Sequence, residues 1–541
     1  MKLLRNLSVV GFAFLCCVAY SQPLKEQFSN NILNIEKWEV LDIAFKAKAT
    51  MASPFTSTFY ADFIHENGTQ QKVHGFYNGG NEWVIRFSAS LEGNWNYTIG
   101  GELNKLNGKT GRVRVGRNKK DNHGGIVIQE SNPQHFYYED GTPYFLLAFE
   151  CDWLYALDYH NKKETPKTNH LLQKIKENGF NHVVMNVFAY DVSWKKDERL
   201  KDYPEHEFGA PKDIFPFLGT NENPDYSSLN INFFKKFDRT ISAMHDKRIV
   251  SHLMIYVWNK LVAWPDMNSK ADDMYFDYVI KRYQAFPNIT WDISKEALYY
   301  GRANFDYIHE RIDRLRANDN YDRLLTVHSY KYCSKFPEKV DYISSQNWAH
   351  NLYDKMYAAR KSHPKKPVFN IEHGGYEESP YVVFTGDYIN AETCLRRNYM
   401  CLFSGVYTTY YWQGASWNVV IYNPFEQPED FIKPKFEYFK HMNTLFTDLD
   451  FSKMKPTPWR NGSGYSLTNI EDTVLIYIHK ENYGINAQFL KKDKKKRTYQ
   501  WFNTLTGELT EEVALTKSHG KFISPWSDVA DAVLISKVVL E

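Results

Sequence analysis

Between residues 126 and 445, short apolar runs alternate with amphipathic segments, and this alternation constrains the fold more than any other feature of the sequence. Eight runs have the length and composition of buried strands: 144–149, 182–187, 249–256, 289–293, 324–327, 342–346, 368–371 and 406–412. Helical patterns lie between most of them, for example at 166–178, 230–246, 272–286, 301–316 and 388–402. This order predicts a parallel (β/α)8 TIM barrel. A doubly wound open sheet is the alternative, but no glycine-rich phosphate loop follows any strand to favour it.

The segments on both sides of this region have β character. Residues 23–116 contain short alternating runs separated by turn signals such as Glu66-Asn67-Gly68, which predict an N-terminal β-sandwich. Further short runs at 474–478, 497–502 and 532–535 predict a C-terminal β-sandwich domain over 447–541. With a barrel over 126–446 between them, a chain of 541 residues has room for three domains.

The first 21 residues have the pattern of a signal peptide. Lys2 and Arg5 form a positive n-region, an apolar run covers 7–18, and residues 19–21 fit the small-x-small rule for cleavage before Gln22. The run is shorter than the ~20 residues of a membrane-spanning helix. An ordinary buried helix is the other interpretation, and a lipid anchor is disfavoured because no small residue precedes either cysteine of the run. We expect an exported protein without a membrane span, periplasmic or secreted.

Charge and cysteine usage narrow the function classes. The formal net charge is only +2, which gives no argument for a nucleic-acid partner. The cysteines beyond the signal peptide match no metal motif, and no His/Asp/Glu cluster has ligand spacing, so we expect no metal and no other cofactor. Whether these cysteines are free thiols or disulfides stays open; they are Cys151, Cys333, Cys394 and Cys401. The aromatic content of 16% suits a packed core and also rings that stack on sugars.

Two glutamates stand where a barrel enzyme places its catalytic groups. Glu296 follows the fourth predicted strand and Glu372 follows the seventh, and active sites of TIM barrels lie at the carboxyl ends of the strands. Glycosidic cleavage needs one protonated and one ionised carboxyl group, which this pair would supply across the barrel mouth. Surface residues or structural ion pairs are the alternative. Because side chains alternate along a strand, we expect Lys295 to point away from the site.

Other residues near the predicted strand ends suit sugar binding. Indole rings stack on the apolar faces of sugars, and amides, carboxylates and imidazoles bind hydroxyl groups. Any one of these tryptophans is more often part of a core than of a site. The candidates for substrate binding are Asp152, Trp153, Asn186, Trp258, Trp291, His328, Gln346, Tyr376, Trp412 and Gln413.

Several of these motifs together resemble the apiosidase-like glycoside hydrolases. The stretch 140–145, followed by Asp152-Trp153, resembles the first barrel strand of that family. Trp291 and Glu296 keep the five-residue spacing of its fourth strand, and 367–377 keeps the Pro-Val-x-x-x-Glu-x-x-x-Tyr-Glu pattern of its seventh. Arg396-Arg397 and Trp412-Gln413 also look like the family. The resemblance extends to the β-domains on either side and covers nearly all of the mature chain.

The sequence departs from the family pattern at the fourth strand. Where the family usually carries Gly-Gly-Asp, this chain has Ser294-Lys295-Glu296. The Asn-Glu pair of related retaining barrels is also absent, because Lys295 precedes the glutamate. The resemblance therefore implies a glycoside hydrolase but not apiose as the sugar.

The leading hypothesis is hydrolysis of a complex polysaccharide by a retaining mechanism. Glu296 would be the general acid/base and Glu372 the nucleophile. The alternative is a non-catalytic carbohydrate-binding protein on the same scaffold, since fold does not fix function. The carboxylate pair discriminates between them, because a pure binder has no need of it. A polysaccharide lyase is a third, weaker option.

Overall fold

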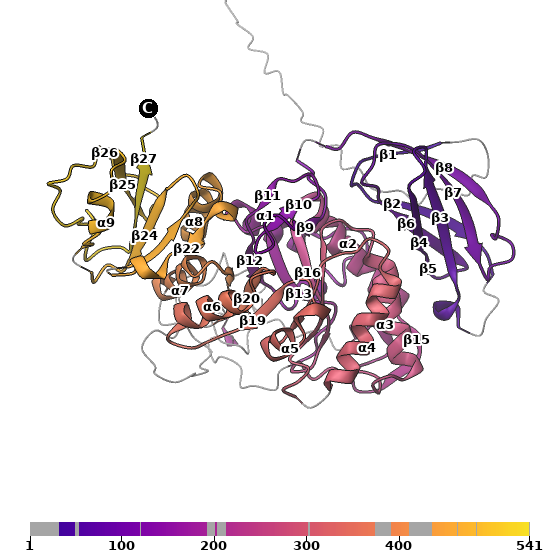
Figure 1. The fold of residues 1–541 in the computed structure, drawn as a ribbon. Helices are drawn as coiled ribbons and strands as arrows, with labels where there is room; N and C mark the ends of the chain where they lie inside the picture. Colours follow the sequence, from indigo (N-terminus) through magenta and orange to yellow (C-terminus); the bar gives the residue numbers. More distant parts are fainter. Residues whose placement is uncertain are drawn as a thin grey trace, which may run out of the picture.

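A barrel of eight parallel strands forms the centre of the molecule. The computed structural model describes residues 32–48, 53–119, 121–191, 201–202, 213–300, 303–373, 391–410, 435–462, 464–482 and 484–539. The barrel strands are β12 (Leu147–Glu150), β13 (His182–Asn186), β16 (Val250–Val257), β17 (Ile289–Lys295), β18 (Leu325–His328), β19 (Ile343–Gln346), β20 (Val368–Glu372) and β21 (Tyr407–Tyr410). Their ladders are parallel and run in the order β18-β17-β16-β13-β12-β21-β20-β19, and β18 also contacts β19. The predicted TIM barrel is thereby confirmed (Figure 1).

Helices surround the barrel. They are α1 (Pro166–Glu177), α2 (Ile231–Asp246), α3 (Lys270–Tyr283), α4 (Phe305–Asn318), α5 (Tyr330–Lys335), α6 (Leu352–Ser362), α7 (Ala391–Phe403) and α8 (Glu437–Asp448). Asn230, Ser269 and Asn304 cap the starts of α2, α3 and α4 by accepting hydrogen bonds from backbone N–H groups. The sequence pattern predicts α1 to α4 and α7 but misses α5, α6 and α8. It also misses a hairpin, β14 (Phe217–Gly219) with β15 (Pro224–Leu229), between β13 and α2.

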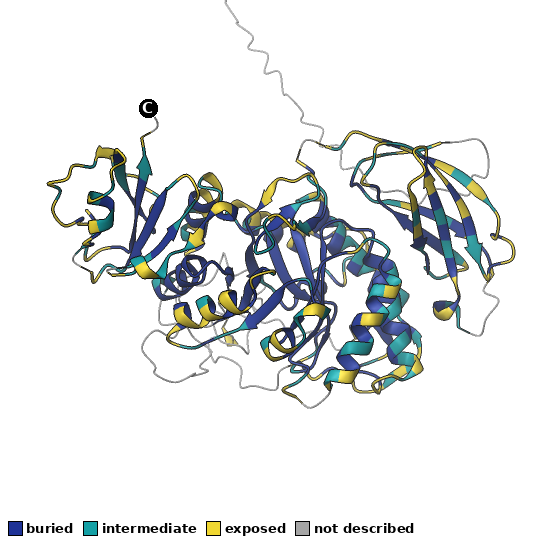
Figure 2. Cartoon of the chain, in the orientation of Figure 1, coloured by how far each residue is buried: buried dark blue, intermediate teal, exposed yellow. Residues whose placement is uncertain are grey.

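The barrel strands are buried on both faces, as Figure 2 shows by their dark colour. All eight residues of β16 are buried, because helices cover the outer face and side chains fill the interior. The interior is unusually polar for a barrel, where branched aliphatic residues dominate. A chain of polar contacts crosses it from His182 through His252 to Asp292. His182 Nε2 lies 3.3 Å from His252 Nδ1, and His252 Nε2 lies 3.1 Å from Asp292 Oδ2.

The N-terminal β-sandwich is also confirmed. One sheet has the order β1-β8-β7-β3-β4, and the other has the order β2-β6-β5. The strands are β1 (Leu33–Glu36), β2 (Leu41–Lys46), β3 (Phe59–His65), β4 (Gln70–His74), β5 (Phe76–Tyr77), β6 (Glu82–Phe87), β7 (Gly93–Gly101) and β8 (Thr110–Gly116). Their inward residues, among them Phe63, Trp83 and Trp95, form a hydrophobic core of their own. A short sheet of β9 (Ile126–Ile128), β10 (Phe136–Tyr138) and β11 (Pro143–Tyr144) precedes the barrel.

The C-terminal domain differs from the predicted β-sandwich. Its described strands form one antiparallel sheet in the order β22-β23-β24-β27-β25-β26. They are β22 (Lys455–Pro456), β23 (Tyr465–Thr468), β24 (Val474–Ile478), β25 (Arg497–Asn503), β26 (Val513–Ala514) and β27 (Ala532–Val538). Leu475 and Tyr477 on one face belong to the core of the barrel, while Ile476 and Leu534 on the other pack with α9 (Gln488–Lys491). The barrel therefore takes the place of the second sheet.

An ion network built on two buried arginines joins the N-terminal sandwich to the barrel. We call Asp42, Arg86, Asp238 and Arg282 the interface cluster. Both oxygens of Asp238, on α2, accept hydrogen bonds from Arg86 of β6 and from Arg282 of α3, and Arg86 also donates to both oxygens of Asp42. These bidentate pairs fix the position of the sandwich against α2 and α3.

Candidate active site

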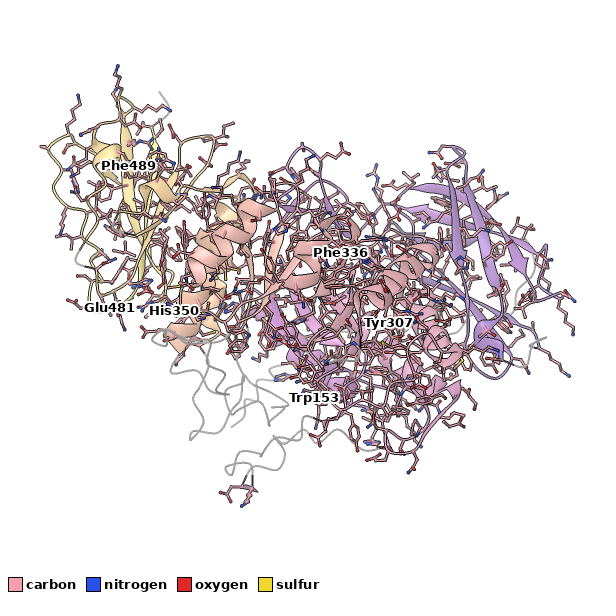
Figure 3. All side chains as sticks on the ribbon, turned by 60° about the horizontal axis from the view of Figure 1, so that its bottom comes forward. Trp153, Tyr307, Phe336, His350, Glu481 and Phe489 are labelled. Carbon is pink, nitrogen blue, oxygen red and sulfur yellow. The ribbon has the colours of Figure 1, made fainter. Side chains whose placement is uncertain are left out.

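Charged side chains gather at the carboxyl ends of the barrel strands, where the sequence predicts the site. Figure 3 turns this end forward and labels Trp153, which follows β12. Glu150 ends β12, Lys295 ends β17 and Glu372 ends β20, and all three side chains are buried. We call Glu150, Asp152, Lys260, Lys295 and Glu372 the active-site cluster.

Two strands carry an extra residue just before their functional side chains. On β17, Asp292 pairs with Thr326 and Lys295 with His328, so three steps on one strand match two on its neighbour. On β20, the two steps from Asn370 to Glu372 match the single step from Ser345 to Gln346 on β19. Such bulges reverse the alternation of side chains and often re-aim a residue next to an active site. They turn Lys295 and Glu372 into the barrel.

The prediction that Lys295 points away from the site is therefore wrong. Its ammonium lies 3.1 Å from Glu372 Oε2 and 3.6 Å from Asp152 Oδ1, and it also pairs with Glu150. The next residue, Glu296, has a φ of +62°, in the left-handed region that side chains other than glycine rarely adopt. Backbone strain of this kind costs about 1–3 kcal/mol and is concentrated at functional sites.

The two predicted catalytic carboxylates lie side by side. The side-chain amide of Gln346 donates to Glu296 Oε1 at 2.8 Å and to Glu372 Oε1 at 2.9 Å. Since one nitrogen reaches both oxygens, these oxygens are less than about 6 Å apart, below the roughly 6.5–9.5 Å separation of inverting pairs. Glu296 is 8% exposed and Glu372 is 1% exposed, so both residues are buried.

Their surroundings move the two pKa values in opposite directions. Burial raises the pKa of Glu296, and the negative charge of Glu372 raises it further. Burial also acts to raise the pKa of Glu372, but the charge of Lys295 and the contact with His328 outweigh it and bring that pKa to about 2. A pair of carboxyl groups whose pKa values are pushed apart can supply one acid and one anion at the same pH.

Several predicted binding residues lie within this network. His328 Nε2 is 3.4 Å from Glu372 Oε2, and Asn186 donates to Asp152 Oδ1 at 3.0 Å. Lys260 pairs with the other oxygen of Asp152 at 3.2 Å. Burial acts to raise the pKa of that carboxyl, but the charges of Lys295 and then Lys260 hold it well below its usual range. Asp152 and Asn186 therefore face the cluster, and contact with a sugar stays a prediction for both.

The predicted tryptophans have different environments. Trp153 and Trp258 are nearly buried, the first with Lys260 5.8 Å from its ring and the second stacked on Tyr256. Trp291 is completely buried, and its indole N–H donates to Asp319 Oδ2 at 2.8 Å. Because Asp292 faces the barrel interior, its neighbour Trp291 faces the helices. The prediction that Trp291 binds substrate is therefore wrong.

Three predicted binding residues, Tyr376, Trp412 and Gln413, lie outside the described residues, as does the predicted signal peptide. In the described part of the chain, no group of His, Cys, Asp or Glu side chains could hold a metal ion. The helices of that part include none that is long and apolar enough to cross a membrane. All four described cysteines are free thiols.

Sequence reasoning missed four residues at this end of the barrel. Glu150 and Lys260 complete the cluster, and Glu150 stands at its strand end as Glu372 does, which is the signal that could have identified it. Tyr299 and Tyr300 are more than half exposed just after Glu296. Burial and then the charge of Glu296 raise the pKa of Tyr300.

Comparison with known proteins gives matches over most of the chain. The family described as "Apiosidase-like, catalytic domain" matches residues 130–428, which is more than half of the sequence. A second family, described as "Domain of unknown function (DUF5060)", matches residues 34–101 in the N-terminal sandwich. No curated protein matches the chain.

Solved structures of similar fold come from Bacteroides vulgatus ATCC 8482. One, described as a glycoside hydrolase, is similar over 94% of this chain and 100% of its own, with a TM-score of 0.71 and 21% identity. A second, of glycoside hydrolase family 5, is similar over 77% of this chain and 94% of its own, with a TM-score of 0.56 and 18% identity. At these identities the similarity shows a shared fold.

Proposed function

Because the chain belongs to the apiosidase-like glycoside hydrolases, we propose that it cleaves a glycosidic bond in a complex polysaccharide by a retaining mechanism with two glutamates. The observation that carries this proposal is the shared hydrogen bond of Gln346 to Glu296 and Glu372. Retaining enzymes need carboxyl groups about 5–5.5 Å apart, and one bridging amide favours such a separation.

The opposite pKa shifts support a different role for each glutamate. Glu296, whose pKa is raised, holds the proton and gives it to the oxygen of the leaving sugar. Glu372, whose pKa is about 2, is ionised and attacks the anomeric carbon, which forms a glycosyl ester as the glycosidic bond breaks. Glu296 then takes a proton from water, the water oxygen attacks the same carbon, and Glu372 is released as a carboxylate.

The same observations weigh against a non-catalytic binder. A binding protein gains nothing from a strained Glu296 backbone or from a buried anion beside a buried acid, and each costs stability. Carbohydrate recognition alone needs exposed rings and hydroxyl-binding groups, which do not require a pair of carboxyl groups with separated pKa values.

The test is a panel of neutral and acidic polysaccharides and 4-nitrophenyl glycosides, with product analysis by NMR. We expect a product whose anomeric configuration is that of the substrate, and an inverted product would contradict the retaining assignment. Glu296→Gln should slow substrates with poor leaving groups most, because those need protonation, while Glu372→Gln should abolish turnover of all. A variant at either position with near-full activity on the natural polysaccharide would refute the assignment.

We also propose that the protein is exported. The n-region, the apolar run and the small-x-small site at 19–21 support cleavage before Gln22. Mass spectrometry of the protein recovered outside the cytoplasm should give a mature N-terminus at Gln22. A lipid-modified cysteine at the N-terminus would show an anchor instead.

A further inference from the structure

Lys295 is a buried cation in direct contact with the proposed nucleophile. Its side chain has no exposed area, and its ammonium lies 3.1 Å from Glu372 Oε2. It also pairs with Glu150, whose side chain is almost completely buried, and lies 3.6 Å from Asp152 Oδ1. A lysine carries a large cost of desolvation, which only nearby anions offset.

The local backbone puts Lys295 in this place. The extra residue on β17 turns the side chain inward, and the left-handed conformation of the next residue then brings Glu296 to the same end of the barrel. Neighbouring residues of a regular strand face opposite ways, so an unbroken β17 would separate Lys295 from Glu296. The bulge therefore brings a fixed positive charge and the acid/base to one site.

We propose that Lys295, held by Glu150, is a positioning residue that keeps the Glu372 carboxylate charged and in one orientation for attack. The inference rests on the proposed function of Glu372 as nucleophile. The Lys295 ammonium lies 3.1 Å and His328 Nε2 lies 3.4 Å from Oε2 of that carboxylate, while Gln346 donates to Oε1, so polar groups face both oxygens. Glu150 acts on Lys295 and not on the substrate.

The charges around Glu372 show why one lysine matters so much. The cluster holds three carboxyl groups and two ammonium groups, so it is neutral when one carboxyl group is protonated. Burial, together with the charges of Asp152 and Glu372, raises the pKa of Glu150 well above its usual range even though Lys295 acts against this. The titratable groups that face this site are Glu150, Asp152, Lys260, Asp292, Lys295, Glu296, Tyr300, His328, Glu372 and His373.

The first experiment measures kcat/KM against pH for wild type, Lys295→Gln and Lys260→Gln, with the 4-nitrophenyl glycoside that wild type cleaves fastest. Loss of the Lys295 charge should move the acidic limb of the profile up by at least about one pH unit, because the nucleophile is then protonated more easily. Lys260→Gln is the matched control: it removes a buried lysine that pairs with Asp152, and the acidic limb should move by less than about half a unit.

A purely structural lysine would lower stability without moving the acidic limb, so an unmoved limb in Lys295→Gln overturns the proposal. Equal shifts in Lys295→Gln and Lys260→Gln overturn it as well. If Glu372→Gln keeps its activity, the proposed function fails; if Glu372→Gln is inactive while the limb of Lys295→Gln stays in place, only the present inference fails.

A second measurement needs no substrate. In a thermal-unfolding cycle of Lys295→Gln and Glu372→Gln, the two changes should be non-additive, because residues in contact share an interaction. We expect Lys295→Gln to lower the Tm by at least about 3 °C less when Glu372 is already Gln. Additive Tm changes would show that the two residues do not depend on each other.

Discussion

The interface cluster and the active-site cluster solve the same electrostatic problem differently. In the interface cluster, two arginines face two aspartates through bidentate hydrogen bonds. In the active-site cluster, two lysines face three carboxyl groups, and Glu150 Oε2 has no hydrogen-bond partner among the described residues. Arginine presents a rigid fork that matches a carboxylate, whereas lysine is a point charge.

This difference determines which carboxyl groups of each cluster are protonated. Burial acts to raise the pKa of Asp238, but Arg282 and Arg86 outweigh it and hold that pKa well below its usual range. In the active-site cluster the positive charge is too scarce for every carboxyl group, so Glu150 has a raised pKa while that of Glu372 is about 2. Matched charges fix the two domains against each other, whereas unmatched charges leave carboxyl groups that differ in protonation, as the proposed mechanism requires.

The largest expected effect comes from Glu372→Gln in the active-site cluster. We expect kcat/KM to fall by at least about 1,000-fold, because the nucleophile is lost. The protein should stay folded, since Lys295 keeps Glu150 and Asp152 as partners. Kinetics on a 4-nitrophenyl glycoside measure the loss of activity, and circular dichroism shows whether the variant is folded. An unfolded variant would contradict the expectation, because the loss of activity would then follow from the loss of fold.

Arg282→Met in the interface cluster should instead lower the folding stability and leave the activity unchanged. Asp238 would keep only Arg86, and breaking a buried pair costs about 3–5 kcal/mol of folding stability. At 25 °C the folded protein should keep its kcat/KM. Denaturant unfolding measures the loss of stability. The control is Arg112→Met, which removes an exposed arginine that donates to Asn96 and should change the stability by less than about 0.5 kcal/mol.

The two clusters also show how far the sequence predicts this protein. Apolar runs and helical segments between them predict every barrel strand, and Glu296 and Glu372 follow because each stands at a strand end. Lys295 was misplaced because a bulge leaves no mark in the sequence pattern. The single sheet of the C-terminal domain was missed because only the fold shows that the barrel covers its second face.

The pH dependence of activity should separate the roles within the active-site cluster. Glu296 must be protonated to act as acid, so kcat/KM should fall about tenfold per pH unit above its raised pKa. Glu372 must be ionised, and with a pKa of about 2 it should limit the rate only in strong acid. A pH-rate profile on the wild type gives both limbs. Glu296→Gln should lose the alkaline limb, and a limb that remains there would belong to another group.

The smallest effect concerns Asp319, a buried carboxyl group that lies outside both clusters. It accepts hydrogen bonds from the indole N–H of Trp291 and from the backbone N–H groups of Tyr321 and Arg323. Burial raises its pKa, although these donors act against the shift. Buried carboxyl groups here thus have three kinds of partner: arginine forks, lysine charges and neutral donors.

Trp291→Phe tests the third kind and also the correction that Trp291 lies in the wall of the barrel. The ring volume is mostly kept, but Asp319 loses one donor, so the free energy of unfolding should fall by about 1–3 kcal/mol. With fewer donors, the pKa of Asp319 rises further above its unfolded value, so the stability deficit of the variant should be largest near neutral pH and shrink as the pH falls through that pKa. KM for a 4-nitrophenyl glycoside should not change, because the indole faces the helices and not the barrel interior. An increase in KM of about tenfold with unchanged stability would return Trp291 to the substrate site.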